Sequence, residues 1–382
     1  MTQTPNDLAF ERMNRVAPEW SAMRPLACLP GITGRMVLHA GPRHELGQIP
    51  APVRNSIAMV ALRERWATSP EAALALLEAG EITLSPAQDF DVFIPLAGAA
   101  GPSTLLIEVT DRNGTGKAYS PLNEGMTLCT RLGIAHPDLP EHLKWLDKTL
   151  GPWLWNRLGA GALDLFPILR AALAAGDDCH SRTMAGSAEL VSALIARRLH
   201  DDPSVQAFLE AAPAFALNVW MAMCGLIAGA AMGVPGSTLV TRAGGNGRLF
   251  GHQLAGEPRH WHTAPAPAIR GTVDTKFQGA VPLGALGDSA LVDLMGLGGQ
   301  ALATAPAVVD ALRPHLPGDA PTRGAAFQHG QLDGFGRSAA TDAAKVQAAD
   351  RGPLILLGMI DAEGLRGRIG GGCVATSGDD FA

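Results

Sequence analysis

The segment from Ala211 to Val234 constrains the fold of this chain more than any other feature. It is long enough to cross a lipid bilayer, which takes about 20 apolar residues in a helix. Its apolar character comes mostly from Ala, Gly and Met, it contains Pro213 and Asn218, and neither end has a basic flank nearby. These features favour a fully buried helix that packs through small residues. We therefore expect an interior helix and no membrane span.

Length and charge narrow the class of protein further. The chain has 382 residues, 47% of them hydrophobic, which is enough for a sizeable core and two or three domains and excludes a disordered chain. A net charge of −6 argues against a nucleic-acid-binding protein. The five cysteines form no CxxC or zinc-knuckle pattern, and the first residues do not resemble a signal peptide. We expect a cytoplasmic protein with free thiols.

The first part of the chain is expected to mix helices and strands. A short amphipathic helix and a linker should precede residue 26. Ser69, Pro70 and Gly80 provide start and stop signals for one helix. The hydrophobic pattern predicts strands over 34–40, 82–85 and 104–110, and helices over 56–66 and 69–79.

The rest of the chain is expected to contain a helical region and then a second mixed region. Spacing near 3.6 predicts helices over 139–200 and 204–231. Beyond these we expect strands over 237–242 and 247–254 around a glycine turn, and then a helix over 288–303. Residues 322–351 are expected to form a mobile flap. A strand over 353–360 and a glycine turn leading into a strand within 368–375 should follow. The predicted class is α+β and multidomain, with domains at 1–145, 146–232 and 233–382, the middle one being small and helical.

One short segment concentrates reactive side chains. Residues 176–182 read GDDCHSR and join two helical stretches. His180 suits acid–base catalysis, and the fork of Arg182 suits a carboxylate or phosphate. Asp177 and Asp178 either hold His180 or cap the next helix. The segment has too few ligands at metal-binding spacing, so we expect no metal there.

Other polar groups are open to two interpretations. Asp288 and Ser289 begin a predicted helix, whose free N–H groups suit an anion, although an ordinary N-cap is the favoured alternative. Asn218 in the apolar helix is either a structural clamp or a substrate contact. His260 and His262 alternate as on one face of a strand, without an obvious third ligand. The segments RNGTGKAYS and GLGG lack the context of phosphate-binding and dinucleotide-binding loops.

Several short segments in order along residues 36–305 resemble the AllG/YlbE-like family, whose namesake is a subunit of oxamate carbamoyltransferase. They read LHAGP, GEITLSP, AYSPLNEG, GDDCHSR, GSTLVT, HTAP and GDSA. The family's usual GDECHNRN is altered here at several positions, and GMIDAE at 358–363 stands where the family has an NTGIAHK-like stretch.

The resemblance implies a cytoplasmic subunit acting with FdrA-like and AllH-like proteins on carbamoyl phosphate or an oxamate-like amide, in ureide or amide nitrogen catabolism, without a cofactor. It implies His180 as acid–base, held by Asp177 or Asp178. Substrate-binding residues would be Arg182, Asn123, Glu124, Asn218, Thr241, Asn246, Asp288 and Ser289. The alternatives are a non-catalytic structural or regulatory subunit, or a related amide-forming or amide-cleaving enzyme with another substrate.

Overall fold

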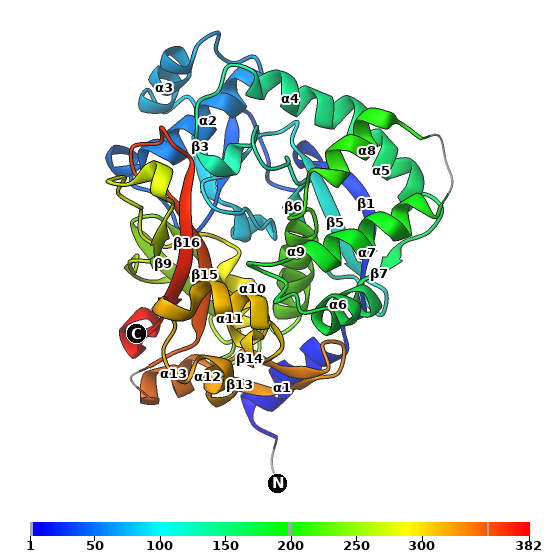
Figure 1. Cartoon of the computed structure of the whole chain (residues 1–382), viewed down its shortest axis with the longest axis vertical. Helices are drawn as coiled ribbons and strands as arrows, with labels where there is room; N and C mark the ends of the chain where they lie inside the picture. Colours follow the sequence, from blue (N-terminus) through cyan, green and yellow to red (C-terminus); the bar gives the residue numbers. More distant parts are fainter. Residues whose placement is uncertain (1–2, 198–200, 350) are drawn as a thin grey trace.

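The apolar segment forms a central helix. The computed structural model describes residues 3–197, 201–349 and 351–382. In it, α9 (Ala216–Gly229) lies near the middle of the molecule (Figure 1). It is buried along nearly its whole length. No helix among the described residues is long and apolar enough to cross a membrane. The prediction of an interior helix is therefore confirmed.

Small residues let α9 pack closely on its neighbours. A Cβ atom on Gly225 would lie 2.0 Å from a ring carbon of Phe93, so only glycine allows this approach. The helix contacts strands β5 (Leu105–Asp111) and β6 (Lys117–Pro121) from the first part of the chain, and β8 (Val240–Asn246) from the last part. It therefore joins both mixed regions.

The N-terminal region contains two small sheets. In the first, the order is β6-β5-β1-β7, with β1 (Pro18–Pro25) antiparallel to β5. Residues 18–25 were expected to be a linker, which is wrong; a bulge near Trp20 breaks the alternation that marks a strand. The second sheet has the order β3-β2-β4, and α2 and α3 connect its parallel pair. The elements are β2 (Met36–His39), α2 (Ala51–Arg63), α3 (Pro70–Glu78), β3 (Thr83–Pro86) and β4 (Ala99–Ala100).

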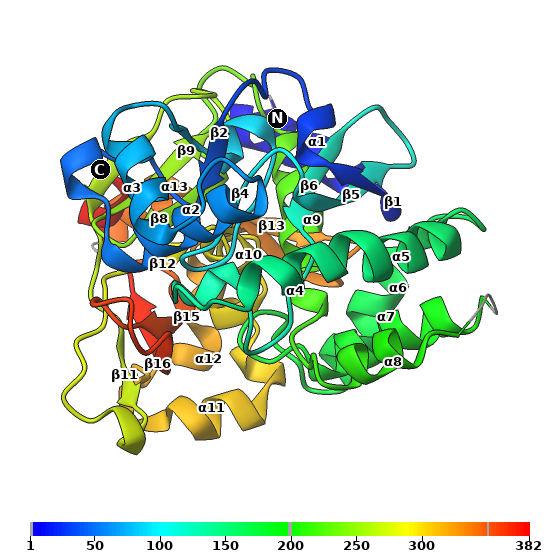
Figure 2. The ribbon, with the colours of Figure 1, turned by 90° about the horizontal axis from the view of Figure 1, so that it is seen from above.

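The helical region lies on one side of the molecule (Figure 2). Its short strand β7 (Leu163–Asp164) nevertheless pairs with β1. The α+β, multidomain class is confirmed, whereas the domain boundaries at 145 and 232 stay a prediction. The helices are α4 (Leu139–Trp145), a π-helix (Leu146–Leu150), α5 (Gly151–Leu158), α6 (Leu165–Ala174), α7 (Met184–Ile195) and α8 (Pro203–Glu210).

The C-terminal region contains three small sheets, with the orders β10-β9-β8-β12, β11-β16-β15 and β13-β14. The new strands are β9 (Leu249–Leu254), β10 (His262–Pro265), β11 (Arg270–Val273), β12 (Leu286–Gly287), β13 (Gln328–Leu332), β14 (Arg337–Thr341), β15 (Leu354–Ile360) and β16 (Arg368–Ala375). The new helices are α10 (Ala290–Leu294), α11 (Pro306–Leu312), α12 (Ala320–Arg323) and α13 (Ala343–Ala349).

Glycine residues account for the wrong strand and helix predictions in this region. Gly244 and Gly245 lie inside β8, and the three glycines at 370–372 lie inside β16, where neighbouring backbone leaves no room for a side chain. The helix expected over 288–303 ends at Leu294, since Gly296 and Gly298 adopt positive φ angles. The expected flap is instead a hairpin and a helix whose Phe327, Leu332 and Val346 are buried, although residue 350 of that range lies outside the described residues.

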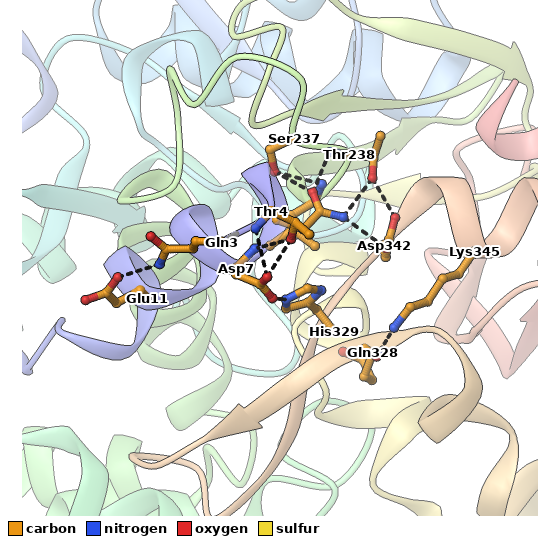
Figure 3. A network of polar contacts seen from close by, with 12 residues as sticks. Gln3, Thr4, Asp7, Glu11, Ser237, Thr238, Gln328, His329, Asp342 and Lys345 are labelled. Atoms are coloured by element: carbon orange, nitrogen blue, oxygen red, sulfur yellow. Dashed lines mark hydrogen bonds and ion pairs between the residues drawn. The ribbon is translucent and has the colours of Figure 1, made fainter. Parts of the chain in front are cut away.

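Helix α1 (Pro5–Asn14) ties the start of the chain to this hairpin (Figure 3). Asp7 caps the helix with Thr4 and accepts a contact from His329 at 3.1 Å. Asn6 donates to Thr238 and to Asp342, each at 3.0 Å. These contacts connect segments more than 200 residues apart, so α1 is part of the folded body.

Candidate functional site

A cavity of about 510 Å³ lies where all three parts of the chain meet. Leu96 and Arg131 come from the first part, the loop before α7 comes from the second, and β15 and β16 come from the third. The polar and charged side chains that line it are Arg131, His180, Ser181, Arg182, Thr183, Thr272, Asp274, Ser289 and Arg368. Three predicted site residues, His180, Arg182 and Ser289, therefore share one cavity.

Asp178 shapes the loop that carries His180 and Arg182. Its carboxylate accepts hydrogen bonds from the backbone N–H groups of His180 (3.1 Å), Ser181 (3.2 Å) and Arg182 (2.7 Å). Burial raises the pKa of Asp178 to about 6. Cys179 adopts a φ of 65°, a conformation rare outside glycine, and this tight backbone loop accommodates it. Asp178 thus fixes the loop through main-chain bonds.

Asp177 serves the start of the next helix. Its Oδ2 accepts from the N–H of Gly186 at 2.9 Å in the first turn of α7. Its Oδ1 lies 3.4 Å from Nε of Arg182. Asp177 is fully buried, and burial raises its pKa. It therefore acts as a cap and as the partner of Arg182.

The carboxylate that holds His180 is Asp293. The Nδ1 of His180 lies 2.6 Å from Oδ2 of Asp293, in the short helix α10. The expectation that Asp177 or Asp178 would orient this imidazole is therefore wrong. Burial by itself would lower the pKa of His180, but the charge and hydrogen bond of Asp293 outweigh it and raise the pKa. The ring is thus held in a fixed orientation and favours its protonated form.

The GLGG segment (residues 296–299) and β15 hold the carboxylate of Asp293. Its Oδ1 accepts from the N–H groups of Gly299 (2.7 Å) and Leu356 (3.1 Å). Gly298 adopts a φ of 50°, and a Cβ there would lie 2.2 Å from Oδ1 of Asp293. The glycines are therefore needed for close approach to the carboxylate of Asp293.

Three guanidinium groups give the cavity a positive character. Arg131 donates to the carbonyl of Gly125 at 2.7 Å, while its buried Nε has no hydrogen-bond partner among the described residues. Arg368 lies over Gly358 and Gly371, where a Cβ would come within 3.3 and 2.9 Å of it. Burial, and then the charge of Arg131, lower the pKa of Arg368. Among the lining residues only Asp274 is a carboxylate, so the lining suits an anionic ligand.

Asn123 and Asn218 clamp the start of α9. Asn123 Nδ2 donates to Oδ1 of Asn218 at 2.9 Å and to the carbonyl of Ala214 at 3.0 Å. Asn218 in turn donates to Ser120 at 3.1 Å. Both side chains lie outside the lining of the 510 Å³ cavity, and these bonds agree with the structural alternative for Asn218.

The other carried-over residues also hold loops rather than line this cavity. Glu124 accepts from the hydroxyl of Thr130, next to Arg131, and burial raises its pKa. Thr241 donates to the carbonyl of Gln253 at 3.3 Å. Asn246 donates to the carbonyl of Pro42 at 2.9 Å.

Asp288 is an interior carboxylate. It accepts from the N–H groups of Gly41 (2.8 Å) and Ile94 (2.7 Å) and from the side chain of Gln88 (2.6 Å), and burial raises its pKa to about 7. The helix that follows spans only Ala290–Leu294, so the expected anion site at a long helix start is not formed. Ser289 remains at the cavity.

A larger cavity, of about 860 Å³, lies beside the C-terminal half of α9. Its charged lining residues are Asp89, Asp91, Asp111, Lys117, Arg242 and Arg259. Arg242, which is buried, pairs with Asp91. The charges here are balanced, whereas the smaller cavity has an excess of arginine and the His180–Asp293 pair, which makes the smaller one the better candidate active site.

Sequence analysis missed Asp293, Arg131 and Arg368. Asp293 was detectable as the lone carboxylate in the apolar run ALVDLMGLGG. Arg368 is the first residue of the glycine-rich strand β16, but only the tertiary structure shows that its side chain lies over Gly358 and Gly371. Nothing in the sequence around Arg131 marks it.

Comparisons with known proteins agree with the motifs. Residues 82–289 match the family described as oxamate carbamoyltransferase subunit AllG. The protein of that name from Escherichia coli K12 is 32% identical over 316 residues, covering 79% of this chain and 75% of its own length. The uncharacterized protein YahG from the same organism is 31% identical, covering 80% of this chain and 66% of its own.

A solved structure shares the whole fold. It is a conserved protein of unknown function from Enterococcus faecalis V583, 26% identical, with a TM-score of 0.92 over 99% of this chain and 95% of that one. Residues 82–289 match the family, and the Escherichia coli protein of that name is 32% identical to this chain. The chain therefore belongs to the AllG family of oxamate carbamoyltransferase subunits.

Proposed function

We propose that this chain is a subunit of a carbamoyl-transferring enzyme and that its 510 Å³ cavity binds the anionic substrate, carbamoyl phosphate or an oxamate-like amide. One observation carries the proposal: Arg131, Arg182 and Arg368 line the same cavity as the His180–Asp293 pair. Guanidinium groups form paired hydrogen bonds with carboxylates and phosphates. Both ligands combine such an anionic group with a carbamoyl or amide carbonyl.

The His180–Asp293 pair would supply the chemistry. Carbamoyl transfer passes through a tetrahedral intermediate with negative charge on oxygen, which fixed donors stabilise. A protonated His180 would donate a proton to the departing group, and Asp293 would hold the ring in place. Asp177 and Asp178 would position the loop, while Ser289 would add a hydroxyl donor. The cavity residues require no cofactor for this role.

The wider context is also part of the proposal. We propose a cytoplasmic hetero-complex with FdrA-like and AllH-like subunits, working in ureide or amide nitrogen catabolism. The name of the Escherichia coli relative describes a subunit, which supports a multi-protein assembly. The three subunits would act together, so the isolated chain should have little transferase activity.

A second candidate is a non-catalytic subunit. It is favoured by the bonds of Asn123, Glu124, Asn218 and Asn246, which hold loops together. Under this alternative, the three arginines would stabilise the assembly and variants at His180 would leave turnover unchanged.

The test is carbamoyl transfer by the chain co-expressed with its partner subunits. His180→Ala should reduce turnover by roughly 100- to 10,000-fold, as for loss of an acid–base group. His136→Ala, at an exposed site away from the cavity lining, is the matched control. Full turnover of an intact His180→Ala complex would favour the non-catalytic alternative.

A further inference from the structure

A second group of ligating side chains lies outside this cavity, at the start of β10. Glu257, His260 and His262 each offer a ligand atom, and these atoms lie within 4.8 Å of one another. The Nε2 of His262 is 3.0 Å from Oε2 of Glu257. The two histidines alone lack a third ligand in the sequence pattern, and Glu257 in the turn before them supplies it.

The backbone fixes this group in place. The N–H of His260 donates to the carbonyl of Glu257 at 3.2 Å, which closes the turn. Arg259 adopts a φ of 68°, and its N–H donates to Oε1 of Gln253 at 2.9 Å. Trp261, between the two histidines, donates to Asp89 at 3.1 Å. The turn is therefore anchored on both sides, so the three ligands need only side-chain adjustments to converge.

A third histidine, His252, packs against His262 of this group. His252 faces His262 across the β9–β10 pairing, and their rings stack with centroids 5.1 Å apart and planes 15° apart. His252 is only 1% exposed, yet neither of its ring nitrogens has a hydrogen-bond partner among the described residues. A buried imidazole without a partner, packed on His262, is the second observation that sets this place apart from an ordinary surface ion pair.

We propose that Glu257, His260 and His262 bind one divalent transition-metal ion of the zinc type. A tetrahedral zinc ion with bonds of about 2.0–2.2 Å separates its ligand atoms by roughly 3.3 Å. The ligand atoms of Glu257 and His262 are 3.0 Å apart and all three lie within 4.8 Å of one another, so small side-chain rotations would reach that spacing. Two imidazoles with one carboxylate form a ligand set that zinc uses.

The site would retain an open coordination position. The side chains of Glu257 and His262 are 56% and 22% exposed. Arg259 of this turn and Gln253 of β9 also line the 860 Å³ cavity. The fourth position is therefore available to water or to an anionic group that enters from solvent.

The test is titration of the metal-free full chain with Zn²⁺ by calorimetry, with Co²⁺ absorption as a probe of coordination. We expect one ion per chain with a Kd below about 10 μM, and a Co²⁺ spectrum typical of tetrahedral nitrogen and oxygen ligands. The double variant His260→Ala/His262→Ala should lower the affinity at least 100-fold. His136→Ala is the control and should bind as the wild type does.

A milder variant keeps the test independent of folding. Glu257→Gln removes the carboxylate charge at an exposed position, so it should melt as the metal-free wild type does but gain less stability from Zn²⁺. Absence of binding by the wild type, or unchanged affinity in the double variant, would overturn the proposal. Activity of the complex plays no part in either readout.

Discussion

The guanidinium groups around the cavity are the residues whose individual contribution is easiest to measure. Arg368 lies over Gly358 and Gly371, and its Nε donates to the carbonyl of Gly370 at 3.0 Å. Among the described residues no ion pair joins it to a carboxylate, so its terminal N–H groups are available to a ligand. Arg182, by contrast, also contacts Asp177. Replacing Arg368 should therefore affect binding more than stability.

We predict that Arg368→Met weakens oxamate binding by roughly 10- to 150-fold, since a hydrogen bond to a charged group is worth about 1.5–3 kcal/mol. Isothermal calorimetry measures this. Arg15→Met is the control, because Arg15 is exposed, pairs with Glu11 and has no chain neighbour that lines the cavity. Equal affinities for both variants would show that Arg368 does not contact the ligand.

The His180–Asp293 pair predicts a pH dependence. Since the folded pKa of His180 is raised, the ring stays protonated above its ordinary 6.5, and anion binding should weaken as pH rises through the raised pKa. The stability that the pair contributes is fully present below about pH 6.5 and is lost over the same rise. Asp293→Asn should shift the binding profile to lower pH, because burial then dominates. Affinity measured from pH 5.5 to 9 checks this; an unshifted profile would contradict it.

At the scale of elements, α9 shows how small residues control packing. Gly225→Ala would place a methyl group 2.0 Å from the ring of the fully buried Phe93. Overpacking costs about 1–3 kcal/mol, more than the gain of up to about 1 kcal/mol from removing a helical glycine. We predict a net loss of about 1–2 kcal/mol in chemical denaturation. Gly318→Ala, with no neighbouring atom within 4 Å, should be nearly neutral.

The predictable elements are those whose signal is local. The interior helix, α3 with its Ser69 cap, and β15 follow from hydrophobic spacing and capping residues. β1 was missed because its bulge and flanking prolines hide the alternation. β8 and β16 were misjudged because glycine marks both a turn and a close approach of backbones, and only the neighbouring chain distinguishes them.

The candidate site was likewise predictable only where its residues have a local signal in the sequence. His180, Arg182 and Ser289 were identified from one segment and one motif, and the structure brings them to one cavity. Asp293 lies 113 residues from His180, so no local spacing could pair them. Asn123, Glu124, Asn218, Thr241 and Asn246, which the family resemblance suggested, bond to neighbouring segments and do not line this cavity, and their role in binding stays a prediction. Bonded and ligand-facing amides look alike in sequence.

At the scale of the whole molecule, hydrogen bonds join α1 to the segment that follows the β13–β14 hairpin. Asp342 accepts from Asn6, Thr238 and the N–H of Ala344. We predict that Asp342→Ala lowers the free energy of unfolding by about 2–3 kcal/mol, at roughly 1 kcal/mol for each lost bond. The exposed Asp333→Ala, which loses one contact to Asn14, should cost less than about 1 kcal/mol. Equal losses of unfolding free energy for the two variants in urea titrations would contradict this stabilising role of Asp342.

The central claim is that the cavity formed by all three parts of the chain holds the substrate. A crystal structure of the protein with oxamate, alone or with co-purified partners, tests it most directly. We predict density between His180 and the arginines, with the carboxylate of oxamate bonded to at least two of Arg131, Arg182 and Arg368. Oxamate bound instead in the larger cavity beside Arg242, with the 510 Å³ cavity empty, would contradict the account.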